Sequence, residues 1–164
     1  MHPLSTPKVD IQILPSFNRR VNKTWLRDLT IAALGLFDPS NPASISILIA
    51  DDATLRELNL KYRGIDETTD VLAFSLHDST YDDPESLTGF DFPSHGTDEL
   101  GDVVISYPQA IRQARENKKT IHSELALLLV HGVLHIMGYD HAEEEDERMM
   151  WAKQDEILEM VGLP

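Results

Sequence analysis

The pattern of apolar and polar positions along the chain switches between a period typical of strands and one typical of helices. Short alternating or β-branched segments predict strands at residues 9–14, 45–49, 70–75 and 102–106. Apolar residues spaced three and four apart predict helices at about 18–37, 51–62, 108–117, 120–137 and 142–160. This order predicts an α+β fold, with a central mixed sheet of about four strands packed by about five helices.

Local signals predict where several of these elements begin. We expect Asn18 to cap the first helix, Asp51 to open the second and Thr120 to cap the fourth, because their side chains can accept bonds from free backbone N–H groups. The stretch 77–99 holds two prolines, two glycines and many acids. It is expected to form a long, solvated loop or flap.

Length and cysteine content limit the class of protein. We expect one domain, 1–164, with a loose N-terminal tail at 1–8. The chain has no cysteine, which excludes disulfides, thiolate metal ligands and a cysteine nucleophile, and fits a reducing cytoplasm. The N-terminus lacks the pattern of a signal peptide, and no apolar run is long enough to span a bilayer.

The charge is strongly negative but unevenly distributed. The formal net charge of −14 argues against broad, non-specific adhesion to nucleic acid or anionic membranes. Residues 66–102 carry eleven acids and no base, whereas residues 1–65 have eight bases against six acids. A locally basic or neutral cleft is therefore compatible with the overall charge.

Three histidines near the C-terminus have the spacing of a metal site. His131 and His135 are four residues apart and fall on one face of a predicted helix. His141 would point elsewhere if the helix continued, but Gly138 can adopt the left-handed conformation that ends it. Three histidines with an open fourth position are typical of catalytic zinc, and we expect one Zn²⁺ per chain. Three histidines with a correctly placed glycine are much less expected by chance than an isolated pair.

The same spacing resembles a zinc-protease pattern in every position but one. The pattern H-E-x-x-H-x-x-G-x-x-H has a glutamate that acts as general base, and this chain has Gly132 there. A metalloprotease-like hydrolase is therefore the alternative rather than the preferred interpretation.

The segment 131–141, HGVLHIMGYDH, closely resembles the signature of the YbeY family of metal-dependent endoribonucleases. Segments 62–64 (YRG), 69–75 (TDVLAFS) and 100–106 (LGDVVIS) are similar to the same family. The resemblance implies an α+β fold with a mixed sheet and cleavage of single-stranded RNA. It also implies a role in ribosomal RNA processing, at the 3′ end of the small-subunit RNA, and in ribosome quality control. The expected partners are ribosomal RNA and the small ribosomal subunit with its proteins.

The predicted catalytic residues are His131, which is also a metal ligand, and Arg63. From its position alone Arg63 is best interpreted as a surface residue, but the resemblance places the matching arginine near the metal, where it would bind phosphate oxygens. Asp102 and Asp140 are each either acceptors behind a ligand or residues that stabilise local backbone. Whether metal-bound water or the RNA 2′-hydroxyl is the nucleophile stays open. A non-catalytic, zinc-stabilised ribosome-binding module is a further alternative.

Overall fold

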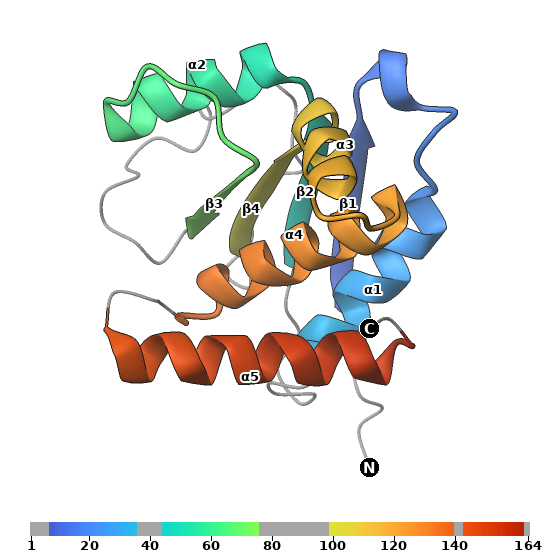
Figure 1. Ribbon diagram of the computed structural model, residues 1–164, viewed down its shortest axis with the longest axis vertical. Helices are drawn as coiled ribbons and strands as arrows, with labels where there is room; N and C mark the ends of the chain where they lie inside the picture. The colour runs from blue at the N-terminus through green and yellow to red at the C-terminus, as the bar shows by residue number, and fades with distance from the viewer. Residues whose placement is uncertain (1–6, 36–43, 76–98, 140–142, 163–164) are drawn as a thin grey trace.

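A computed structural model describes residues 7–35, 44–75, 99–139 and 143–162 of the chain. Its centre is a four-stranded sheet in the order β1-β2-β4-β3 (Figure 1). Strands β1 (Lys8–Ile13), β2 (Ser44–Ala50) and β4 (Glu99–Ser106) run parallel, and β3 (Val71–Ser75) runs antiparallel along the edge of β4. The predicted mixed sheet is confirmed.

The helices cover the two faces of this sheet unequally. Helix α2 (Asp52–Arg63) packs on one face, and helices α1 (Lys23–Gly35) and α4 (Ile121–Ile136) pack on the other. Helix α3 (Tyr107–Glu116) packs against α4. Helix α5 (Glu144–Met160) lies on the outer side of α4, which is therefore enclosed between the sheet and α5 (Figure 1). None of the helices in the described ranges has the length and apolarity needed to cross a membrane.

Two apolar cores follow from the alternation of side chains along the strands. On β4, Val103 and Ile105 face α4 and belong to the larger core, whereas Val104 faces α2 and belongs to the smaller one. Strands β2 and β4 are covered on both faces, so they are buried almost continuously along their length.

The structure corrects two of the predicted boundaries. Helix α1 is capped four residues after Asn18, by Asn22, whose side-chain oxygen accepts from the backbone N–H of Trp25 at 3.1 Å. The intervening residues follow a 3-10 turn, η1 (Pro15–Phe17), and bury Val21 in the larger core. Strand β1 begins at Lys8, one residue inside the expected tail. Of the expected loop 77–99, only Glu99 is described, and it belongs to β4.

The predicted cap at the start of α2 is confirmed and makes stability depend on pH. Asp51 Oδ1 accepts from the hydroxyl of Thr54 at 2.6 Å and from its N–H at 2.9 Å. These bonds hold the pKa of Asp51 below its ordinary value of 3.8. Because the folded-state pKa is lowered, this stabilisation is present above that value and is lost as the pH falls through the lower folded-state pKa.

We therefore expect Asp51→Ala to reduce the free energy of unfolding by about 1 kcal/mol at neutral pH. The difference from the parent chain should shrink as the pH falls below 3.8 and the carboxyl group is protonated. Urea unfolding at neutral and acidic pH measures both quantities. Asp51→Asn keeps an acceptor without a charge, so it should remove the pH dependence and retain most of the cap. An Asp51→Ala deficit that persists unchanged in acid would contradict this explanation.

Candidate metal centre

Two of the three histidines of the predicted site, His131 and His135, are carried by α4, which is the most buried of the described helices. Thr120 caps its start, as predicted, by accepting the N–H of Ser123 at 3.0 Å. Ten of its sixteen residues are buried, so the helix is held from several sides. A side chain on this helix therefore has a well-defined position in the fold.

Gly138 ends α4 in the predicted manner. Its φ of 101° lies in the region that favours glycine. The N–H of Gly138 donates to the carbonyl of His135 at 3.1 Å, and the N–H of Tyr139 donates to the carbonyl of Leu134 at 3.0 Å. This pair of bonds is the Schellman motif, which closes a helix and redirects the chain.

His131 and His135 converge on one point beside the last turns of α4. Their Nε2 atoms are 3.1 Å apart, and the ring planes meet edge to face at 77°. Two nitrogens bound to one zinc ion at 2.0–2.1 Å in tetrahedral geometry would be about 3.3 Å apart. Both rings are half-buried. The pair thus fits two ligands of a shared metal ion, with one exposed side left for further ligands.

The third predicted ligand, His141, lies outside the described residues, as does Asp140. Within the ranges that the structure describes, no cluster of three or more His, Cys, Asp or Glu side chains could hold a metal. The structure therefore brings together two of the three predicted ligands.

Gly132, which replaces the glutamate of the protease pattern, lies where α4 touches the sheet. A Cβ at this position would be 2.6 Å from Cγ1 of Val103 on β4 and 3.3 Å from Cγ2 of Val71 on β3. The position faces strands rather than the histidine pair, and any side chain there would collide with them. The helix can approach the sheet only because this residue is glycine.

The other described polar residues singled out in the sequence, Asp102 and Arg63, are carried by β4 and α2 rather than by α4. Asp102 is fully buried on β4, and by strand alternation it shares the α2 face with Val104, opposite the face that meets Gly132. Arg63 is the exposed last residue of α2, just before Gly64 with its φ of 71°. No hydrogen bond or ion pair joins Arg63 to another described residue, and α2 lies across the sheet from α4.

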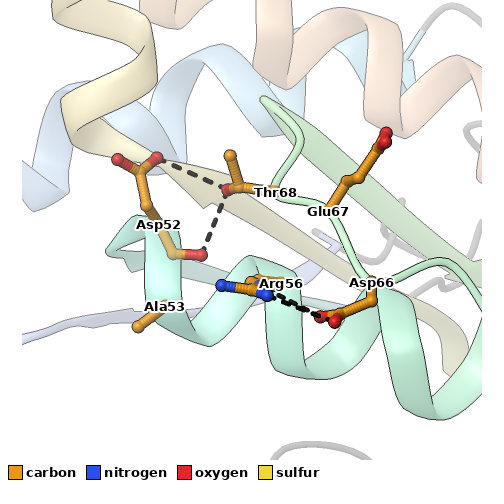
Figure 2. Close-up of a pocket in the computed structure, with 6 residues that line it drawn as sticks. All are labelled: Asp52, Ala53, Arg56, Asp66, Glu67 and Thr68. Carbon is orange, nitrogen blue, oxygen red and sulfur yellow. Dashed lines mark hydrogen bonds and ion pairs between the residues drawn. The ribbon is translucent and has the colours of Figure 1, made fainter.

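The structure also contains a pocket that the sequence did not predict. It measures about 560 Å³ and lies beside α2; it is lined by Asp52, Ala53, Arg56, Asp66, Glu67 and Thr68 (Figure 2). Arg56 is paired with Asp66 at 2.7 Å, which lowers the pKa of that carboxyl group. No local spacing in the sequence connects the lining residues on α2 with those at 66–68.

Asp52, at the edge of the pocket, joins three segments. It accepts from Arg112 at 2.8 Å and from the hydroxyl groups of Ser106 and Thr68. These contacts connect the start of α2, the start of α3 and the loop before β3. Because Arg56 and Arg112 are each paired with a carboxylate here, these contacts hold the segments around the pocket together.

Comparison with known sequences decides which family has this arrangement. The sequence model described as Endoribonuclease YbeY matches residues 12–162, which include all three histidines and every predicted strand and helix except the first half of strand 9–14. The chain belongs to the YbeY family. The resemblance based on the histidine segment is thereby confirmed.

Individual YbeY proteins are similar in sequence to this chain over most of its length. It is 39% identical over 156 residues to an endoribonuclease YbeY of Roseiflexus sp. (strain RS-1), covering 94% of this chain and 93% of that one. It is 40% identical over 147 residues to the YbeY of Desulfitobacterium hafniense, covering 89% and 90%. The fold resembles the solution structure of TM1509 from Thermotoga maritima, with a TM-score of 0.56 and 24% identity over 93% of this chain and 88% of that one.

Proposed function

We propose that this chain is a zinc-dependent endoribonuclease that cleaves single-stranded RNA. The observation that carries the proposal is the 3.1 Å separation of the His131 and His135 Nε2 atoms, in a chain of the YbeY family. His141 is proposed as the third ligand, because Gly138 ends the helix three residues before it. In the cell the chain is proposed to act in the cytoplasm on ribosomal RNA, at the 3′ end of the small-subunit RNA, and in ribosome quality control.

The proposed chemistry divides between the histidines and an arginine. Zinc held by three neutral imidazoles would lower the pKa of a bound water to about 7 and so supply hydroxide or a base toward the 2′-hydroxyl group. His131 and His135 keep their rings fixed because α4 is enclosed on several sides. Arg63 is proposed to bind phosphate oxygens of the RNA, since it is exposed and has no ion pair with a described residue.

Two alternatives predict different behaviour. A metalloprotease-like hydrolase shares the spacing of the histidines, but a carboxylate at the position of Gly132 would meet the sheet rather than the metal. A zinc-stabilised binding module would need the metal to fold. The described core is extensive without any contribution from the histidine pair, which favours a catalytic over a structural metal.

The test is cleavage of an end-labelled single-stranded RNA by zinc-loaded protein, before and after removal of the metal by a chelator. We expect cleavage to stop on chelation and to return on addition of Zn²⁺, while the circular dichroism spectrum stays essentially unchanged. Collapse of the spectrum on chelation would identify the structural module instead. Undiminished cleavage by the metal-free chain would disprove metal dependence.

A further inference from the structure

Eight of the fourteen Lys and Arg residues of this acidic chain fall in two short segments. Segment 19–27 contains four bases and no acid, and segment 112–119 contains four bases and the single acid Glu116. In a chain with a net charge of −14, this concentration is far from an even distribution. The two segments are separated by more than eighty residues, so the sequence alone does not connect them.

The fold brings these two segments side by side through two ring contacts. Phe17 packs against Tyr107 at the start of α3, with ring centroids 5.0 Å apart. Trp25 packs against His122 at the start of α4, with centroids 3.6 Å apart. The chain from Phe17 to Trp25 is therefore anchored at the start of α3 and at the start of α4, and the starts of α1 and α4 lie next to each other (Figure 1).

Most of the bases in this region are not used by the protein itself. Arg112 is paired with Asp52, and Arg27 donates to the carbonyl of Val9. The remaining six are exposed, and none of their side chains has a hydrogen bond or ion pair with another described residue. We call them the basic ridge: Arg19, Arg20, Lys23, Arg115, Lys118 and Lys119. Elsewhere in the described residues, Arg56, Arg148 and Lys153 are paired with acids, whereas Lys8 and Arg63 stand singly, far apart in the sequence, without an ion pair to a described residue. Six cations without such partners carry a positive charge that an anionic ligand can neutralise.

We propose that the basic ridge binds the sugar-phosphate backbone of RNA and holds the substrate at the end of α4 opposite the histidine pair. The inference deepens the proposed function and rests on it for the RNA substrate. His122, beside the ridge, precedes His131 and His135 by nine and thirteen residues, which is about 14 to 20 Å along the helix. A strand that keeps the stacked spacing of about 3.4 Å per nucleotide would need roughly four to six nucleotides to cover that distance, and an unstacked single strand would need fewer.

The surroundings of the ridge favour RNA over a lipid surface. Membrane-binding surfaces combine cations with exposed large apolar side chains. Among the residues that the structure describes, the exposed large apolar side chains lie elsewhere, on α2, in the loop after it and on α5: Leu60, Ile65, Met149, Trp151 and Met160. Trp25 is only half-exposed and is covered on one side by His122. The ridge therefore offers charge for phosphates without apolar groups for a bilayer.

The test compares two double variants with the same change in charge. Lys23→Gln/Lys119→Gln removes one cation from each segment of the ridge, and Arg148→Gln/Lys153→Gln removes two paired cations from α5. Binding of a fluorescent 20-nucleotide single-stranded RNA is measured by anisotropy at several salt concentrations. The His135→Ala background keeps this RNA uncut. KM and kcat for cleavage are measured without the His135 change.

For the ridge variant we expect Kd to rise about tenfold and the slope of log K against log salt to fall by about 1.4, since each contact with single-stranded phosphate contributes about 0.7. KM should rise while kcat stays within about twofold, and the α5 variant should match the parent in both assays. Equal Kd values for the two variants, or no RNA binding by the parent chain, would overturn the inference. So would stronger binding to phosphatidylglycerol vesicles than to RNA. RNA bound at the ridge but never cleaved would instead refute the proposed function and leave this inference standing.

Discussion

His135→Ala is expected to reduce cleavage of single-stranded RNA by at least about a thousandfold. The substitution removes one of two imidazoles whose Nε2 atoms converge at 3.1 Å, and a metal held by fewer ligands is lost or misplaced. The side chain is half-buried near the end of α4, so its removal leaves the enclosed part of the helix intact. Single-turnover cleavage and bound zinc per chain should therefore fall together, while the melting temperature changes little.

Ser123→Ala is the matched control for this variant. Ser123 lies on the first turn of the same helix, is also half-buried, and contributes only its backbone N–H to the Thr120 cap. It should keep parental cleavage and zinc content. If His135→Ala kept full activity, the histidine pair would not be the catalytic metal centre, and a contaminating nuclease would have to be sought.

Gly132→Glu, the change that completes the zinc-protease pattern, is expected to prevent folding rather than to create a protease. Its Cβ would lie 2.6 Å from Val103 Cγ1, and its carboxylate would be buried against β3 and β4 without a described partner. Overpacking and an unpaired buried charge together should cost at least about 5 kcal/mol in the free energy of unfolding. Urea unfolding, or recovery in the soluble fraction where the chain does not fold, measures the loss.

Gly132→Ala separates the two contributions, because it adds the steric conflict without the charge. It should reduce the free energy of unfolding by about 1 to 3 kcal/mol, even though alanine is the better helix former. A Gly132→Glu chain with parental stability would show that α4 does not approach the sheet here. Peptide hydrolysis by that chain would revive the protease alternative.

The elements that could be predicted are those whose signals are local. The caps by Asp51 and Thr120 and the helix end at Gly138 each depend on atoms within a few residues, so the sequence pattern was sufficient. The predicted start of α1 was wrong, because Asn18 and Asn22 are both residue types that cap helices well. The choice between them depended on η1 and on the burial of Val21, which involve distant parts of the chain.

The histidine spacing was likewise a local signal, because residues four apart on a helix must share a face. It predicted that His131 and His135 converge, which the structure confirms, and it led to the family that the comparisons establish. Local spacing could not predict where Arg63 lies relative to this pair. That position depends on how α2 and α4 are distributed over the two faces of the sheet.

The sequence by itself therefore determined the elements, most of their ends, the convergence of His131 and His135 and the family. These follow from hydrogen bonds and periodicities that extend over a few residues. Only the tertiary structure decided the strand order β1-β2-β4-β3, the reason why position 132 excludes a side chain, and the meeting of segments 19–27 and 112–119 in one basic ridge. Each of these depends on packing between residues far apart in the chain, and no periodicity along the sequence records which surfaces will meet.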